Sequence, residues 1–233
     1  MRTMHIVALT VLIVAFLIGP SMWVQHVLRK YSEPADRYPG TGGELARHLL
    51  DRLNLHHIGV ESVDAAKGGD HYDPQAGMVR LTPDKFSGRS LTAITVAAHE
   101  VGHAMQDRDG FAPLRWRTNL IKVVAVSNKA GAGLLVVAPV VGLLTRTPVA
   151  GLLFAAGGVI SLGTGALVHL VTLPTEFDAS FGRALPILKG DDILLPGDQR
   201  HAKRLLTAAA LTYVSSALMS LLNVGRWLAI LRR

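Results

Sequence analysis

Four long apolar stretches stand out in the hydrophobic pattern of this 233-residue chain. The first covers residues 4 to 24 and contains no Lys, Arg, Asp or Glu; the others cover about 123 to 144, 149 to 172 and 205 to 224. Each approaches the roughly 20 residues that an α-helix needs to cross the apolar core of a bilayer. The pattern therefore predicts a mainly α-helical, multi-pass membrane protein with about four transmembrane helices.

The same stretches predict how the chain is divided. Residues 1–24 are expected to form a retained transmembrane anchor, because no small-residue cleavage site follows them; a signal peptide is the alternative. Residues 119–172 are expected to form a transmembrane hairpin around a turn at residues 146–148, with glycines in both arms that allow close packing. Residues 205–233 are expected to form the last transmembrane helix and a C-terminal tail.

The polar segment of residues 25–118 has a mixed pattern, which predicts a small α+β segment between the first two transmembrane helices. A capping box at Thr41-Gly-Gly-Glu44 is expected to start a helix with a leucine stripe on one face. Short strands are predicted at residues 58–63 and 78–82, with a turn at residues 69–74 between them. The second strand is expected to form an exposed edge of the sheet, to which an extended substrate can add.

The amino-acid composition limits which side chains can bind a metal ion. No cysteine is present, which excludes disulfides and thiolate ligands, so a metal would be held by His and carboxylate side chains. The mean hydropathy is +0.33 and only 18% of the residues are charged, as is typical of a membrane protein. The net charge of +7 comes from basic residues that flank the apolar stretches. This favours a lipid bilayer with anionic headgroups as a partner and argues against nucleic acid.

The sequence His99-Glu100-Val101-Gly102-His103 is an HExxH motif, which is typical of a catalytic zinc site. It lies in a helix predicted over residues 89–106. Residues four apart share one face of a helix, so both imidazoles can reach one cation, while Glu100 can act as the general base. Gly102 is expected to allow close packing near the site, because glycine otherwise weakens a helix. Two unrelated histidines on a helix are the alternative.

A catalytic zinc ion usually has three protein ligands and one open position, so the motif needs a third ligand. Glu176 is the candidate, because two membrane crossings would return it to the same side as the HExxH helix. A glutamate at the membrane interface without a metal is the alternative. Asp178 is a candidate partner of a zinc-bound imidazole, although a solvated or helix-capping aspartate has the same pattern. The third-ligand segment is expected to cover residues 173–204.

The predicted turn at residues 69–74 carries two further candidates, His71 and Tyr72. Either side chain can stabilise the oxyanion if a substrate lies along the neighbouring strand. The alternative is a turn held by hydrogen bonds of its own aspartate side chains. Both residues are therefore candidates for contact with the substrate rather than with the metal.

Several blocks of the chain resemble the YugP-type family of bacterial membrane zinc metallopeptidases. They are residues 69–74, 79–81, 96–104, 110–115, 172–180 and 208–214. The resemblance implies a zinc-dependent, multi-pass membrane peptidase, with residues 25–118 as a zincin-like catalytic segment. A wider likeness to the gluzincins, including the HtpX-like membrane proteases, implies Glu176 as a zinc ligand. In that pattern an aspartate four positions after the glutamate orients a zinc-bound histidine, and here Ser180 stands in that place.

These features together predict a membrane-bound zinc metalloendopeptidase that cleaves a protein or peptide substrate at or near the membrane surface. Zn²⁺ is the expected cofactor, held by His99, His103 and Glu176. The protein is expected in the cell membrane, which here means the inner membrane of a bacterium. The positive-inside rule favours a cytoplasmic location for the catalytic segment. A non-catalytic, zinc-stabilised membrane scaffold and a small multi-pass transport component are the alternative functions. The oligomeric state is left open by the sequence.

Overall fold

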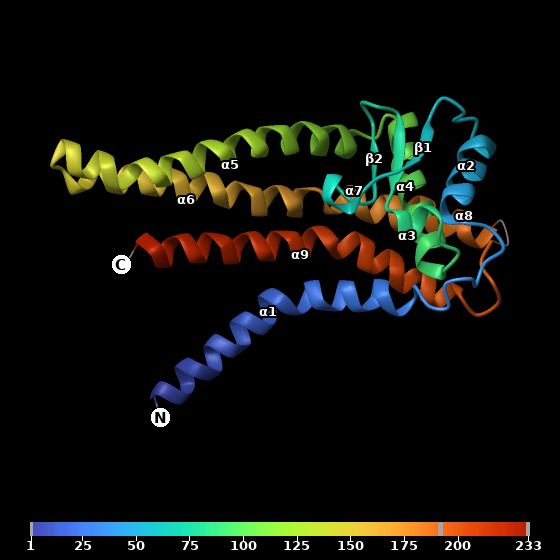
Figure 1. Ribbon diagram of the computed structural model, residues 1–233, viewed down its shortest axis with the longest axis horizontal. Helices are drawn as coiled ribbons and strands as arrows, with labels where there is room; N and C mark the ends of the chain where they lie inside the picture. The colour runs from blue at the N-terminus through green and yellow to red at the C-terminus, as the bar shows by residue number, and fades with distance from the viewer. Residues whose placement is uncertain (1, 191–192, 232–233) are drawn as a thin grey trace. The chain divides into compact units, whose positions relative to one another are not determined.

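The computed structural model describes residues 2–190 and 193–231, most of them in helices (Figure 1). The chain forms two compact units. One consists of Met22–Arg115 and Pro174–Thr212 and contains a small β-sheet, so we call it the sheet-bearing unit. The other consists of the remaining helical segments, and we call it the helical unit. The sheet-bearing unit includes the first residues of the stretch that was expected to form the last transmembrane helix.

The helices and strands have the following bounds. The sheet-bearing unit contains α2 (Gly42–Arg52), β1 (Gly59–Ser62), a short 3₁₀-helix η1 (Ala65–Lys67), β2 (His71–Asp73), β3 (Met78–Leu81), α3 (Pro83–Phe86), α4 (Leu91–Arg108), α7 (Leu173–Phe177), a π-helix η2 (Asp178–Ala184) and α8 (Leu185–Gly190). The helical unit contains most of α5 (Ala112–Thr145) and α6 (Pro148–Val171). The two units share α1 (Arg2–Lys30) and α9 (Gln199–Leu231).

The sheet has three strands in the order β1-β3-β2, so β3 lies in the middle. β3 pairs in parallel with β1, with Val60 opposite Val79, and antiparallel with β2, with Tyr72 opposite Val79. The expectation that residues 78–82 form an exposed edge is therefore wrong, because ladder hydrogen bonds occupy both sides of β3. Residues 71–73, expected within a turn, form the edge strand β2.

Helix α4 is the centre of the sheet-bearing unit, and its side chains are buried along almost the whole length. Ser90 caps its N-terminus by accepting a hydrogen bond from the backbone N–H of Ala93 at 3.2 Å. Gly110 follows the C-terminus with a left-handed φ of 64°. Helix α2 and strands β2 and β3 pack against α4. The helix that carries the HExxH sequence is thus a core helix.

The number of membrane spans differs from the prediction. Among the described residues one helix, α5, is long and apolar enough to cross a membrane, so the expectation of about four transmembrane helices is wrong. Parts of the other apolar stretches instead serve the protein core. Val24 of α1, and Leu205 and Leu206 of α9, are buried in the core of the sheet-bearing unit, where protein surrounds them. In α6 the described apolar run, Val149–Gly158, is about half as long as a span.

Helix α5 is mostly exposed, because only 11% of its most apolar 18-residue window is buried. Within the helical unit it approaches α6 closely through glycines. A Cβ atom at Gly151 would lie 3.0 Å from the backbone oxygen of Ala138 and 3.2 Å from Cα of Gly142. The two helices therefore pack at a distance that larger side chains would not allow at these positions.

Candidate metal centre

Two histidines of α4 and one glutamate of α7 lie side by side in the sheet-bearing unit. The Nε2 atom of His99 is 3.3 Å from Oε2 of Glu176, and Nε2 of His103 is 3.5 Å from the same oxygen. One nitrogen or oxygen atom from each of the three residues lies within 4.8 Å of the others. No side chain of the three is more than 5% exposed. Three groups that commonly bind metal ions thus face one another in a buried site.

Hydrogen bonds around His103 determine which of its ring nitrogens carries the proton. The side-chain amide of Gln106, which is fully buried, donates to the backbone oxygen of Thr175 at 2.8 Å and to Asp178 at 2.9 Å. The amide oxygen of Gln106 therefore faces Nδ1 of His103, at 2.9 Å, and can only accept. A neutral His103 then carries its proton on Nδ1, which leaves the lone pair of Nε2 on the side of Glu176.

His99 is held in the same way by a hydroxyl group. Ser180 donates its one hydroxyl proton to the backbone oxygen of Leu206 at 3.2 Å, so it accepts from Nδ1 of His99, which is 3.1 Å away. His99 thus also carries its proton on Nδ1 and has its free lone pair on Nε2. Ser180 stands where the gluzincin pattern has an aspartate, and in this structure it makes a contact of that kind with a histidine.

The three residues fit a zinc ion. Two Nε2 lone pairs and a carboxylate are all electron-pair donors, and their close approach in a buried site is unfavourable unless a cation lies between them. Ligands about 2.0–2.2 Å from a tetrahedral zinc ion lie about 3.4 Å from one another. The observed separations of 3.3 Å and 3.5 Å agree with that spacing. We call His99, His103 and Glu176 the candidate metal centre.

Glu100 follows His99 directly on α4 and is 5% exposed. Within the part of the chain that the structure describes, its carboxylate forms no hydrogen bond and no ion pair. Neither oxygen of this carboxylate is fully enclosed, so the group keeps some access to solvent although most of the residue is buried. Its position next to a candidate ligand is suited to proton transfer.

A close contact between α4 and η2 places the third residue of the centre. A Cβ atom at Gly102 would lie 2.6 Å from the backbone oxygen of Ala179, so only glycine fits here without a shift. The expected role of Gly102 in close packing is therefore confirmed. Ala179 precedes Ser180 in the π-helix, a type of helix found frequently at functional sites.

Asp178 contacts neither histidine directly. It accepts hydrogen bonds from the amide of Gln106 at 2.9 Å and from Nε of Arg183 at 2.8 Å. Arg183 also pairs with Asp109, and hydrogen bonds from Arg108 and Arg183 lower the pKa of Asp109 to about 2. Asp178 therefore acts on the candidate metal centre through Gln106 and not as the direct partner of an imidazole.

His71 and Tyr72 lie on β2 and make other contacts. The Tyr72 hydroxyl donates to Asp107 at 2.8 Å; burial, together with this hydrogen bond, raises the pKa of Tyr72 well above its ordinary value. Nδ1 of His71 is 2.9 Å from the backbone oxygen of Gly69. Among the described residues, neither side chain forms a hydrogen bond with the candidate metal centre.

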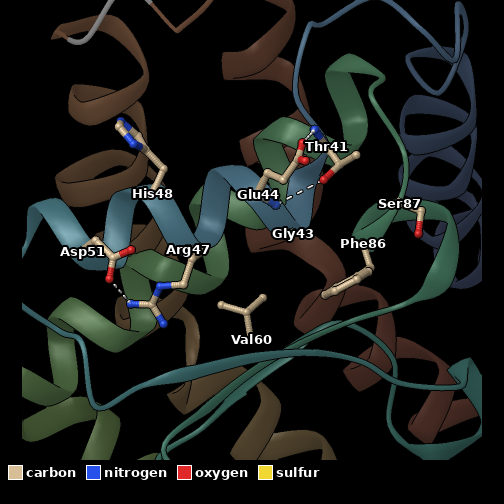
Figure 2. A pocket seen from close by; sticks show the side chains of 9 residues that line it. All are labelled: Thr41, Gly43, Glu44, Arg47, His48, Asp51, Val60, Phe86 and Ser87. Atoms are coloured by element: carbon tan, nitrogen blue, oxygen red, sulfur yellow. Dashed lines mark hydrogen bonds and ion pairs between the residues drawn. The ribbon is translucent and has the colours of Figure 1, made fainter.

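A pocket of about 670 Å³ lies between α2, β1 and α3, away from these residues (Figure 2). Val60 points from β1 toward α2, between Arg47 and Phe86. Arg47 pairs with Asp51 at 2.7 Å, and Glu44 accepts from the backbone N–H of the helix cap at 2.8 Å. No residue of the candidate metal centre lines this pocket, so we do not place the reaction there.

Gln106 is the one residue of this site that the sequence patterns did not single out. It follows His103 by three positions, which places both on the same helix face. That spacing was the available signal. A glutamine after an HExxH motif has many other uses, however, and its partners Thr175 and Asp178 are distant in the sequence.

Comparison with known proteins agrees with this geometry. Residues 4–232 match the family described as "Putative neutral zinc metallopeptidase". The chain is also 34% identical over 217 residues to the "Putative membrane protease YugP" of Bacillus subtilis (strain 168), an alignment that covers 91% of this chain and 92% of that protein. No solved structure matches the chain significantly. The resemblance found in the sequence blocks is thereby confirmed, and the chain belongs to the family of "putative neutral zinc metallopeptidases".

Proposed function

We propose that the protein is a zinc-dependent metalloendopeptidase that hydrolyses peptide bonds of proteins at or near a membrane surface. The observation that carries this proposal is the candidate metal centre, in which two histidines whose Nδ1 atoms face the side-chain oxygens of Gln106 and Ser180 meet a carboxylate at the spacing of zinc ligands. A zinc ion that only tied segments together would not need Glu100 beside its ligands, which argues against a scaffold. Membership of the family supports the same class of reaction.

The chemistry needs a Lewis acid and a base. A zinc ion held by His99, His103 and Glu176 would supply the Lewis acidity that polarises a peptide carbonyl and lowers the pKa of water. Glu100 takes a proton from the attacking water, whose oxygen bonds to the carbonyl carbon. When the C–N bond breaks, Glu100 passes this proton to the leaving amine.

We place the substrate along β2, the edge strand that packs against α4. An extended peptide can add to such an edge through backbone hydrogen bonds. His71 is partly buried on this strand, and we assign to it the contact with the carbonyl oxygen of the substrate. Tyr72 already donates its hydroxyl proton to Asp107, so its role is to hold β2 against α4 rather than to donate to an oxyanion.

The membrane location is also part of the proposal. Helix α5 is the candidate anchor, and the Bacillus subtilis relative is named a membrane protease. Arg115, Arg117 and Lys122 precede the most apolar part of α5, whereas Arg146 follows it. By the positive-inside rule this distribution favours the cytoplasm for the segment before α5, which contains Glu100. Glu176 lies 3.3 Å from His99 in the same folded unit, so the chain returns to this side after α5. We therefore propose a protein of the bacterial cell membrane with its catalytic residues on the cytoplasmic side.

Replacing Glu100 with Gln tests the proposed reaction. The E100Q protein is expected to bind zinc as the wild type does but to cleave casein about 10²–10⁴ times more slowly, because the general base is lost. A matched control is Glu61→Gln, which changes a half-exposed glutamate of β1 paired with Arg80 and is expected to cleave normally. Zinc binding with an undiminished rate of cleavage by E100Q would rule out this function for Glu100.

A further inference from the structure

Gln106 connects the two segments that form the candidate metal centre. It belongs to α4, one helical turn from His103, and none of its surface is exposed. Its side-chain amide reaches three groups, at 2.9 Å to Nδ1 of His103, 2.8 Å to the backbone oxygen of Thr175 and 2.9 Å to Asp178. One side chain thus contacts both a candidate ligand and the segment that carries Glu176.

Each hydrogen bond restrains a different part of the centre. The bond with His103 orients the imidazole and keeps its proton on Nδ1. Thr175 immediately precedes Glu176, and Asp178 follows it by two positions, so the other two bonds hold the glutamate from both sides. The amide of Gln106 therefore helps to set the separation between His103 and Glu176, 3.5 Å from Nε2 to Oε2, together with the close packing of α4 against η2.

The contacts also require an amide in particular. An amide offers an acceptor oxygen together with two N–H donors, and all three are used here. An ionised carboxylate would have no proton for Thr175 or Asp178, and an apolar side chain would make none of the bonds. Asp178 is itself fixed by Nε of Arg183 at 2.8 Å, so the network continues to a charged group. Because the acceptor and both donors of this buried amide have partners, the Gln106 side chain is held rigidly between the two segments.

We infer that Gln106 is a positioning residue for metal binding, which sets the distance and orientation between His103 and Glu176. The inference rests on the proposed function and adds a residue to it. Gln106 contacts neither the metal nor the substrate; it acts through the imidazole and through the α7–η2 segment. Its loss therefore weakens zinc binding directly and lowers peptidase activity as a consequence.

The experiment compares the full-length wild type with Gln106→Met, a side chain of similar size that forms none of these hydrogen bonds. Competition with a chromophoric chelator is expected to show a 10–100-fold loss of zinc affinity, the usual effect of removing a partner of a ligating histidine. The absorption spectrum of the cobalt-substituted protein is expected to change as well. Thr95→Ala is the matched control, because Thr95 is buried on the same helix and its hydroxyl has no hydrogen-bond partner among the described residues.

The control is expected to keep the wild-type affinity and cobalt spectrum. The inference is overturned if Gln106→Met binds zinc as tightly as the wild type with the same spectrum, or if Thr95→Ala weakens binding as much. Nitrogen NMR of metal-free wild-type protein gives a second test, which needs no variant. It should show His103 with its proton on Nδ1, and a proton on Nε2 would also overturn the inference. If the wild type bound no zinc at all, the proposed function would fail instead.

Discussion

A methyl group added at Gly102 tests the contact that places Glu176 next to the histidines. The Cβ atom of Gly102→Ala would lie 2.6 Å from the backbone oxygen of Ala179, whereas a close carbon–oxygen contact is about 3.3 Å. Helices α4 and η2 must therefore separate by roughly 0.7 Å. Ser180, which contacts His99, follows Ala179 directly, so the shift disturbs the hydrogen bond to the imidazole and the position of Glu176.

Two opposing effects determine the stability of this variant. Overpacking costs about 1–3 kcal/mol, while replacing glycine by alanine within a helix gains about 1 kcal/mol. The free energy of unfolding should therefore fall by only about 0–2 kcal/mol. Activity should fall further, because misplacement by about 1 Å can cost a factor of about 100 in rate. For a shift of roughly 0.7 Å we expect a loss of at least about tenfold.

Three measurements on purified G102A check this reasoning: chemical unfolding, zinc affinity and cleavage of casein. Gly133→Ala is the matched control, because a Cβ atom at that position of α5 meets nothing within 4 Å. The control should keep the zinc affinity and activity of the wild type. If G102A were about 1 kcal/mol more stable than the wild type, with unchanged zinc affinity and cleavage, the higher helix propensity of alanine would be the only effect of the substitution. The close approach of α4 and η2 would then be refuted.

One further substitution probes the surroundings of the site, and another probes an ion pair elsewhere in the sheet-bearing unit. Ser180→Ala removes the acceptor for the Nδ1 proton of His99, so zinc affinity should fall about tenfold or more; an unchanged affinity would contradict this assignment. Burial tends to raise the pKa of Asp198, but hydrogen bonds from Arg37 and Tyr38 outweigh it, so this pKa lies below its ordinary value. Asp198→Asn should therefore lower the free energy of unfolding at pH 7 by about 1.5–3 kcal/mol. In the unfolded chain the carboxyl of Asp198 titrates near pH 3.9. The difference in free energy of unfolding between the wild type and Asp198→Asn should therefore shrink as the pH falls below about 4. A difference that does not change with pH would contradict the ion pair.

Local patterns predicted much of the sheet-bearing unit. The capping box of Thr41 and Glu44 is present, α4 covers most of the helix predicted over residues 89–106, and β1 and β3 lie within the predicted residues. These features depend on neighbours along the chain, which the sequence displays directly. Strand β2 was missed because three residues are too few to show an alternating pattern. The central place of β3 was missed because it depends on a pairing between distant residues.

The membrane spans show a limit of hydropathy. Val24 and Leu206 are buried in the core of the sheet-bearing unit, yet they belong to stretches with the composition of transmembrane helices. An apolar side chain has the same hydropathy whether protein or lipid surrounds it. Counting apolar residues therefore gave too many spans. Burial, which only the folded structure shows, identifies the parts of α1 and α9 that pack into this core.

In the candidate metal centre, contacts between residues close in the sequence could be predicted, whereas contacts between distant residues could not. The spacing of His99 and His103 follows from one turn of a helix, so the sequence alone predicts that they are neighbours. Glu176 was chosen by counting two membrane crossings, an argument that the single candidate span does not support. Its closeness to the histidines instead comes from the packing of α4 against η2 within one folded unit. Gln106 was missed because two of its three partners come from that distant segment.

The central claim is that His99, His103 and Glu176 share one zinc ion, and metal analysis of purified protein tests it most directly. The wild type and Glu61→Ala, which changes a surface glutamate, should each carry one zinc ion per chain. Glu176→Ala should lose most of its zinc under the same dialysis, because one of three protein ligands is gone. A wild type without zinc, or a Glu176→Ala protein that keeps its zinc fully, would contradict the account.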